Sequence, residues 1–222
     1  MNTQKRAYTA VVATAEHKRG PGRPPEGVRD AILQTTLELI SEIGVSRLTT
    51  KELSRVGGFS EASIYYHFAD KGALIEGVIL DGVLAPFQEF AAGFAERAPD
   101  GDLEEMLLEF TKALTSFWEQ VLPLLSAVQS DAELRRRFRQ RLNSLDLGPH
   151  RGVRLVGRLL AYQQEQGRIR ADVDPEPVAM LVCSTCYLTG YQRHMLGVKA
   201  ARQLPRLAPT VSSLVALLRP NA

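Results

Sequence analysis

Residues 48–71 read LTTKELSRVGGFSEASIYYHFADK, and the spacing of their side chains predicts two short helices joined by a tight turn. Thr49 followed three residues later by Glu52 is a capping box, in which the hydroxyl and the carboxylate each accept from a free backbone N–H. A helix is therefore expected to begin directly after Thr49, with Leu53 and Val56 facing inward at helical spacing.

The glycine pair 57–58 is expected to end this first helix, because glycine adopts the left-handed conformation that a sharp turn requires. Phe59 would fill the angle between the helices, and Ser60 has the small oxygen-bearing side chain preferred at an N-cap. Ile64 and Phe68, four residues apart, would face the core. The segment therefore predicts a helix-turn-helix, a motif whose second helix enters the major groove of DNA.

The outer face of the second helix supplies the candidate DNA contacts. Ser63 and Tyr66 are the best candidates for contacts with base edges. Tyr65, His67 and Lys71 suit phosphate contacts, which position a protein on DNA without reading its sequence.

Glu61 is an acid on this presumed DNA face and has two interpretations. It could accept a hydrogen bond from a cytosine amino group, or it could point away from the phosphates. The complete predicted set of DNA-contacting residues is Thr50, Lys51, Ser60, Glu61, Ala62, Ser63, Tyr65, Tyr66, His67, Lys71 and, from the N-terminal tail, Arg23.

The pattern T-x-x-E-L-S-x-x-G-G-F-S-x-x-x-I-Y-x-H-F-x-x-K resembles the N-terminal signature of the TetR family of bacterial transcriptional regulators, over roughly residues 28–80. It departs from the usual signature at three positions. Gly57 stands where alanine is usual, Phe59 where valine is usual, and Ala62 where glycine is common. The resemblance implies a dimer formed by the last two long helices and a ligand cavity in the second domain.

Composition is that of a soluble globular protein, with 45% apolar and 23% charged residues among 222. The net charge is only +2, and the positive charge crowds the N-terminal tail. Two cysteines three positions apart give no disulfide framework. No apolar run approaches the ~20 residues that span a bilayer, and no signal peptide is evident, so a cytoplasmic location away from membranes is expected.

The first 25 residues are expected to form a disordered basic tail. Its Gly22-Arg23-Pro24 core resembles an AT-hook, in which an extended arginine enters a narrow A·T minor groove. The alternative is a solvated leader that adds only nonspecific attraction to phosphates.

An all-α fold is expected, with a DNA-binding domain at 26–80 and a helical ligand-binding and dimerisation domain at 81–222. Helical periodicity begins at Val28, Gly44 stops the first helix, and Pro86 should end or kink the helix that begins near Asp70. The remaining helices are expected near 102–121, 131–146, 150–167, 175–196 and 204–218.

Specific binding by so small a motif calls for two copies on neighbouring major grooves, so a homodimer on a palindromic operator is expected. Its surface could be a four-helix bundle of the last two helices, closely packed at Ser184 and Gly190. Some of the same residues could instead close the core of one chain. The candidate residues are Val178, Leu181, Val182, Leu188, Val211, Leu214, Val215 and Leu218.

Large adaptable side chains on the middle helices suit a pocket for an apolar small molecule, although a packed core is the alternative. A ligand that favours one of two dimer states would release the operator. The predicted ligand-binding residues are Met106, Phe110, Phe117, Trp118, Tyr162, Met180, Cys183 and Tyr187.

Other chemistry is weakly indicated. Cys183 and Cys186 have redox or metal spacing, but small-residue packing is the better interpretation. The arginine run 135–141 is interpreted as a solvated helix face far from the DNA-binding domain. His150 and His194 have no ligand-spaced partners, so neither a metal nor a cofactor is assigned. Nucleophile, phosphate-loop and paired-carboxylate motifs are not evident, which argues against an enzyme.

The leading hypothesis is therefore a ligand-responsive repressor. The alternatives are an activator or nucleoid-type regulator without a ligand, an enzyme with an accessory DNA-binding domain, and a redox-responsive regulator using the cysteine pair. A second domain without a cavity would favour the first of these.

Overall fold

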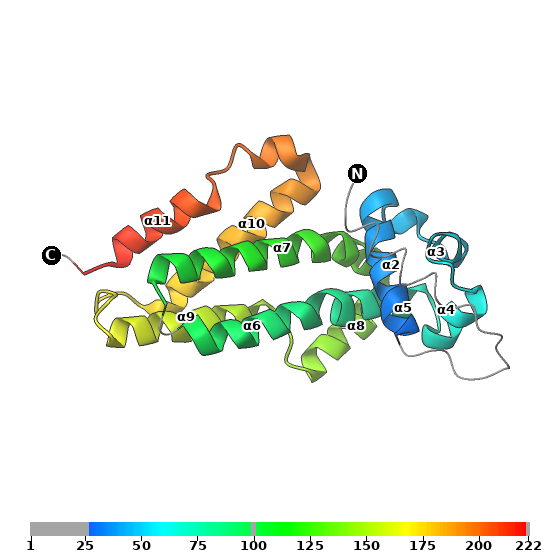
Figure 1. Ribbon diagram of the computed structural model, residues 1–222, viewed down its shortest axis with the longest axis horizontal. Coiled ribbons are helices and arrows are strands. Elements are labelled where there is room, and N and C mark those ends of the chain that lie inside the picture. Colours follow the sequence, from blue (N-terminus) through cyan, green and yellow to red (C-terminus); the bar gives the residue numbers. More distant parts are fainter. Residues whose placement is uncertain (1–26, 99–100, 221–222) are drawn as a thin grey trace.

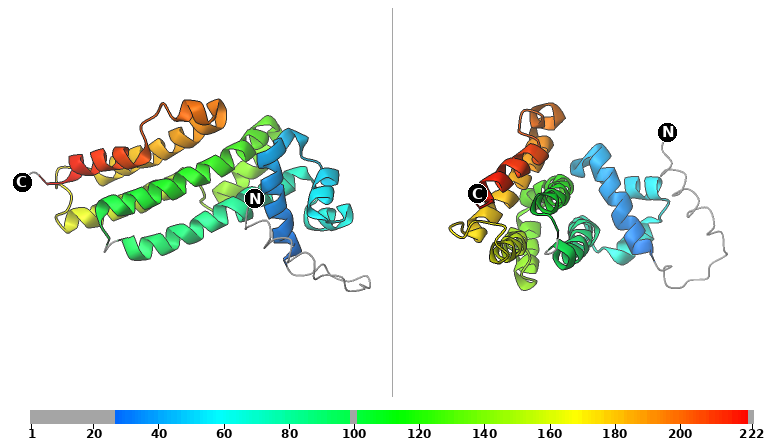
Figure 2. Two further views of the ribbon diagram at one scale, coloured as in Figure 1. Left: turned by 45° about the horizontal axis from the view of Figure 1, so that its top comes forward. Right: turned by 60° about the vertical axis from the view of Figure 1, so that its left-hand side comes forward.

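The computed structural model describes residues 27–98 and 101–220, and within these ranges the secondary structure is helical, with no strand (Figure 1). The helix-turn-helix lies at one end of an elongated molecule and the last turn of α11 lies toward the other (Figure 2). The elements are α2 (Val28–Ile43), η1 (Val45–Arg47), α3 (Thr50–Gly57), α4 (Glu61–His67), α5 (Lys71–Gly77), η2 (Val78–Leu84), α6 (Ala85–Arg97), α7 (Leu103–Ser130), α8 (Ala132–Ser144), α9 (Pro149–Glu165), α10 (Pro175–Ala201) and α11 (Leu207–Leu218).

The helix starts around the turn are confirmed. The Thr49 hydroxyl accepts from the backbone N–H of Glu52 at 3.1 Å, and the Ser60 hydroxyl accepts from that of Ser63 at 3.0 Å. The reciprocal half of the capping box is wrong, because the Glu52 carboxylate accepts from Arg55 on the same helix. An inward-facing Val56 is also wrong: its side chain is exposed, whereas Leu53 is fully buried.

The two glycines of the turn do different things. Gly58 has φ 70° and makes the left-handed end of α3. Gly57 is helical, and a Cβ there would lie 2.2 Å from the ring of Phe59. The first glycine is therefore required by close packing and the second by backbone conformation.

The helix from Lys71 continues past Pro86 to Arg97, so the proline does not end it. A wide π-helical turn, η2, precedes the proline, and the N–H of Ala85 donates to the carbonyl of Leu80. Proline lacks an N–H and its ring clashes with the carbonyl four residues earlier in an α-helix. Widening the helix directly before Pro86 relieves that clash.

The same stretch, Lys71–Arg97, is long and apolar enough to cross a membrane by length and composition alone. The expectation of no such apolar run is therefore wrong. One such helix is weak evidence for a membrane span. Its buried residues Leu74, Ile75 and Val78 belong to the core that includes the helix-turn-helix.

Two hydrophobic cores lie along the molecule, and α7 passes through both. Its C-terminal half contributes Val121, Leu124 and Val128 to the core around α2–α5. Its N-terminal half packs with α9, α10 and α11. The helix was expected to end at 121, but it continues through Pro123 to Ser130 because the residues beyond the proline are buried in the first core.

The last two helices pack differently from the expected bundle. Val211, Val215 and Leu218 of α11 are buried within the chain, where α11 packs on α7. Gly190 of α10 faces Trp118 of α7, whose Cβ would lie 2.8 Å from an added Cβ. The close approach at Gly190 is therefore made inside one chain.

Candidate functional site

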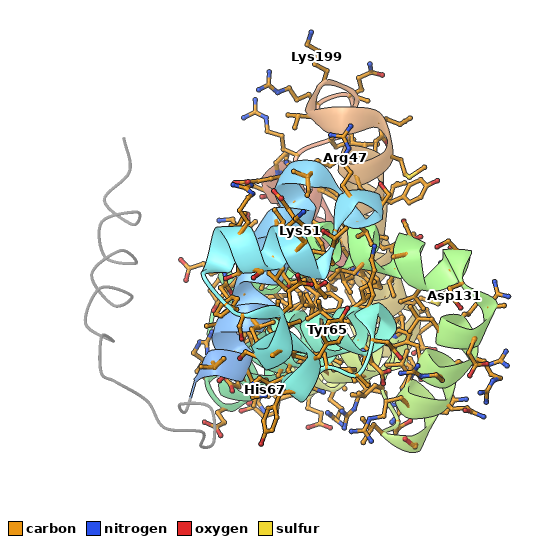
Figure 3. All side chains as sticks on the ribbon, turned by 90° about the vertical axis from the view of Figure 1, so that its right-hand side faces the viewer. Arg47, Lys51, Tyr65, His67, Asp131 and Lys199 are labelled. Carbon is orange, nitrogen blue, oxygen red and sulfur yellow. The ribbon has the colours of Figure 1, made fainter. Side chains whose placement is uncertain are left out.

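The outer face of α4 is exposed to solvent. Tyr65 and Tyr66 have 55% and 67% of their surface exposed, whereas Ile64 and Phe68 are buried. Figure 3 shows the molecule from this end, with Tyr65 on α4 and Lys51 on α3. The capped start at Ser60 and the buried Ile64 thus fix α4 with its aromatic side chains directed into solvent.

The Glu61 carboxylate is held by the neighbouring helix. Its Oε2 accepts from the Thr50 hydroxyl at 2.7 Å, joining the first turns of α3 and α4. A second tie runs from the Ser54 hydroxyl to the carbonyl of Phe59 in the turn. In this arrangement Glu61 serves the junction of the two helices, and Thr50 is its partner.

Lys71 and His67 both make contacts within the chain that the sequence did not predict. The Lys71 ammonium donates to the carbonyl of Val45 in η1 at 2.9 Å. The ring of His67 lies edge-on to Tyr66, with centroids 5.0 Å apart. Its Nε2 is buried and has no partner within the part of the chain that the structure describes. Arg23 lies outside the described residues.

An ion pair lies on the surface of α3. Arg55 pairs with Glu52, and that hydrogen bond lowers the pKa of the Glu52 carboxyl and raises the pKa of the Arg55 guanidinium. Lys51 and Arg47 are exposed. Arg47 was missed as a candidate DNA contact; its position just before the helix-turn-helix was the available signal (Figure 3).

The predicted ligand-binding residues are only partly brought together: Phe117 and Trp118 pack against the second core, and the ring centroid of Tyr187 lies 5.0 Å from that of Trp118. Met106, Phe110 and Cys183 are buried in the second core, whereas Met180 and Tyr187 have 61% and 40% of their surface exposed. The exposed Met180 thus lies outside the interior that encloses Met106. The eight residues do not form one enclosed cluster within a single chain, and their role in ligand binding stays a prediction. Of the others, Tyr162, Phe117 and Trp118 are partly buried.

A phenylalanine cluster between α6 and α7 was not predicted. Phe87 lies 4.9 Å from Phe117 and Phe94 lies 5.3 Å from Phe110, measured between ring centroids. Phe90 stacks on Phe94 at 5.8 Å. Positions 87, 90 and 94 are three and four residues apart, so the sequence already indicated that these side chains share one face of a helix.

The guanidinium of Arg97 lies over the rings of Phe90 and Phe94, 5.8 Å from each ring centroid. The indole N–H of Trp118 is buried and has no hydrogen-bond partner among the described residues. A cleft of about 520 Å³ lies elsewhere, and no predicted ligand-binding residue lines it. Its lining residues are Gly101, Asp102, Leu103, Arg168, Arg219 and Pro220.

The two cysteines are free thiols buried where α10 meets its neighbours. Burial raises the pKa of Cys183 to about 12 and that of Cys186 to about 11. Since the thiolate is the reactive form, these thiols are suited to packing rather than to redox chemistry. Within the described ranges no three His, Cys, Asp or Glu side chains are grouped to hold a metal ion.

The arginine run on α8 was expected to lie far from the DNA-binding domain, and this expectation is wrong. Leu134 and Phe138 of the same helix are buried in the core with the helix-turn-helix. Arg137 pairs with Asp70, the N-cap of α5. Helical periodicity identified a charged face but could not show which element lies against it.

A family described as bacterial regulatory proteins, tetR family, matches residues 32–78. The tetracycline repressor protein class D of Escherichia coli is 26% identical over 89 residues, 40% of either chain. The nucleoid occlusion factor SlmA of Aliivibrio fischeri (strain MJ11) is 44% identical over 52 residues, 23% of this chain and 26% of that one. The chain thus spans less than half the length of these curated relatives.

Solved structures match over far more of the chain. Salmonella enterica GusR is 24% identical with a TM-score of 0.60, over 90% of this chain and 99% of that one. A TetR transcription regulator from Haloarcula marismortui is 21% identical with a TM-score of 0.64, over 86% and 98%. At these identities the likeness establishes the fold, in both the helix-turn-helix and the second helical domain.

Proposed function

We propose that the chain is a DNA-binding transcriptional regulator of the TetR family, a homodimeric repressor released from a palindromic operator by a small apolar effector; the match of residues 32–78 to the tetR family supports this. It acts in the cytoplasm and has no catalytic role. Residues 26–80 bind DNA, and 81–222 form the dimer and receive the effector.

The observation that carries the proposal is an exposed apolar face on α10. Two recognition helices must lie about 34 Å apart to enter successive major grooves, which requires a second copy of this small motif. Large exposed apolar patches on soluble proteins mark interaction sites. The exposed apolar residues of α10 are Met180, Leu181, Tyr187, Leu188, Tyr191, Met195, Leu196 and Val198.

This face revises the dimer surface expected from the sequence. Leu181 and Leu188 are exposed and stay in the proposed surface, whereas Val182 is buried within the chain. From α11 the proposal adds Leu217, which was not among the predicted residues and is 70% exposed, and drops Val211, Val215 and Leu218, which are buried within the chain. The α10 face is therefore the larger contribution.

Replacing Leu188 with glutamate tests the dimer. A charge placed in a buried apolar interface is strongly unfavourable, so we expect the L188E protein to sediment as a monomer at concentrations where the wild type is a dimer. Loss of operator binding should accompany it. The control is Ser213→Glu, an equal charge on an exposed position of α11. Dimeric L188E, or a monomeric wild type, contradicts the proposal.

The effector is proposed to bind beside the phenylalanine cluster of α6 and α7. Aromatic walls favour an apolar ligand, and the buried Trp118 N–H offers one donor for orienting it. Thermal-shift titration with a panel of apolar compounds tests this part. A compound that raises the melting temperature should also release DNA.

The close packing of the same phenylalanines favours a second candidate, a regulator of this fold that takes no ligand. Five rings pack in contact from Phe87 to Phe117. An unchanged melting temperature across the whole panel would favour this candidate over the ligand-released repressor.

A further inference from the structure

Helix α8 connects the second domain to the exit of the recognition helix. The side chains of Leu134 and Phe138 are 6% and 5% exposed and lie in the core that contains Leu74 and Ile75 of α5. The Leu134 methyl group is 3.2 Å from the position that a Cβ on Gly72 would occupy. The first turn of α5 therefore packs directly against Leu134 of α8.

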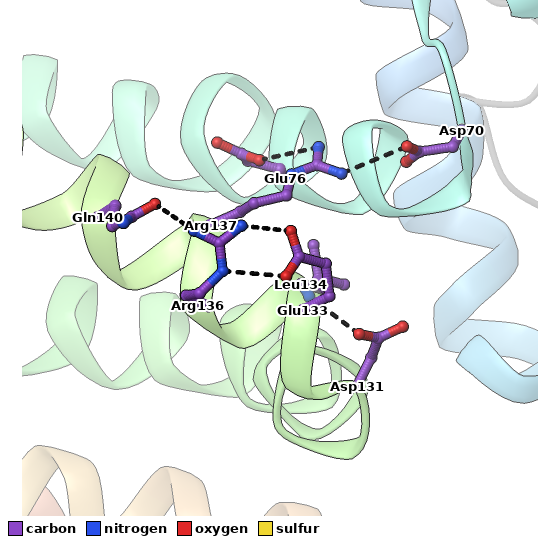
Figure 4. Close-up of polar contacts among 8 residues, drawn as sticks. All are labelled: Asp70, Glu76, Asp131, Glu133, Leu134, Arg136, Arg137 and Gln140. Atoms are coloured by element: carbon purple, nitrogen blue, oxygen red, sulfur yellow. Dashed lines mark hydrogen bonds and ion pairs between the residues drawn. The ribbon is translucent and has the colours of Figure 1, made fainter.

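Arg137 adds a charged contact at the same place (Figure 4). Its Nη1 lies 3.3 Å from Oδ2 of Asp70, and its Nη2 lies 3.9 Å from Oε2 of Glu76. The other Asp70 oxygen, Oδ1, accepts from the backbone N–H of Ala73 at 2.6 Å. One guanidinium thus bridges the N-cap of α5 and an acid farther along the same helix.

Asp70 lies in the short connection between α4 and α5, so a contact that holds Asp70 also restrains this connection. Asp70 follows His67, the last residue of α4, by three positions. A fixed Asp70 leaves the chain between α4 and α5 little freedom. The pKa of its carboxyl is lowered, first by the Ala73 N–H and then by Arg137, in keeping with a carboxylate held from two sides.

We propose that Arg137 is a positioning residue for DNA binding: by bridging Asp70 and Glu76 it holds the exit of α4 to α8 and so sets the orientation of the recognition helix relative to the second domain. The part of this inference that concerns DNA binding rests on the proposed function. Exposed ion pairs contribute little to overall stability, so the variants below should fold.

The neighbouring Arg136 provides a matched control. It pairs with Glu133 on α8 itself, so Arg136→Gln removes the same charge from the same helix without touching α5 (Figure 4). Asp70→Asn is the partner variant. Asparagine caps helices as well as aspartate does, so this change removes the charge at Asp70 and keeps an acceptor for Ala73.

The DNA readout uses a duplex that the wild-type protein enriches from a random-sequence pool. We expect R137Q and D70N each to weaken its binding about tenfold, and the double variant to bind no worse than either, because contacting residues that share one function are not additive. R136Q should bind within about twofold of the wild type. Equal affinity of R137Q and R136Q, tighter binding by R137Q, or additive losses would overturn the inference.

Hydrogen exchange without DNA provides the second readout and separates this inference from the proposed function. Amides of residues 66–75 should exchange faster in R137Q than in R136Q, with melting temperatures equal for the two proteins. If they do and no duplex is enriched, the bridge stands and the proposed operator binding fails. Equal exchange in the two variants overturns the bridge whatever the DNA result.

Discussion

Glu61 has the charge least suited to a DNA-facing helix, and its carboxylate accepts from Thr50 at 2.7 Å. The sequence identified the acid but left its partner open, because Thr50 lies eleven positions away on another helix. The same limit applies to Lys71, whose ammonium donates to the Val45 carbonyl. Residue type and spacing predicted the faces of these helices, whereas hydrogen bonds between elements needed the fold.

Replacing Glu61 with glutamine distinguishes its two interpretations. Glutamine can still accept from Thr50, but it removes a negative charge close to the phosphates. We expect operator affinity to rise about two- to fivefold at low salt and the gain to shrink as salt increases, because screening weakens repulsion between exposed charges. Fluorescence titration at two salt concentrations measures this. Weaker binding by E61Q would instead support a base contact with cytosine.

The two glycines of the turn predict distinct mutational effects. Gly57→Ala places a Cβ against the Phe59 ring, so we expect a loss of about 1–3 kcal/mol in the free energy of unfolding through overpacking. Combining it with Phe59→Val should recover most of that loss, since valine removes the ring. Urea denaturation checks both proteins. A G57A protein as stable as the wild type would show that the ring moves without cost.

At the scale of the element, boundaries marked by caps were predictable and packing partners were not. Gly44 and Asp174 mark helix ends where expected. The helix was wrongly predicted to end before Pro123, because burial of the residues after the proline outweighs the loss of its N–H as a hydrogen-bond donor. The position of the arginine run of α8 was also predicted wrongly. A helix can have a solvated face and still pack its Leu134 and Phe138 on a segment distant in sequence.

Because α10 buries two thiols, we expect the free energy of unfolding to decrease at alkaline pH. Cys183 and Cys186 have pKa values raised to about 12 and about 11 in the folded protein, from an ordinary value of 9.0. The folded state therefore holds these protons where the unfolded state releases them. Stability is fully present below pH 9 and falls as pH rises toward 11.

The measurement is urea denaturation at pH 8, 9 and 10, compared with a variant in which both cysteines are alanine. The variant starts less stable, because it removes buried atoms. Its loss of stability between pH 8 and 10 should nevertheless be smaller than that of the wild type. Parallel pH dependence in the two proteins would show that the thiols do not contribute.

At the scale of the whole molecule, the helix-turn-helix, the all-α fold and the resemblance of residues 32–78 to the tetR family were predictable, because caps, glycines and aromatics recur at fixed offsets in residues 48–71. The second domain was less predictable. Helical periodicity shows that Val211 and Val215 share a buried face, but not whether α7 or a second copy covers it. It also cannot show that α7 serves two cores.

Selection of DNA from a random-sequence pool tests the central claim, that α4 reads DNA as one half of a dimer. The wild-type protein should enrich an inverted repeat with half-sites about one helical turn apart. The double variant Ser63→Ala, Tyr66→Ala should enrich a different sequence or none, while its dimer remains intact. Failure of the wild type to enrich any sequence, or enrichment of the same repeat by the α4 variant, would contradict the account.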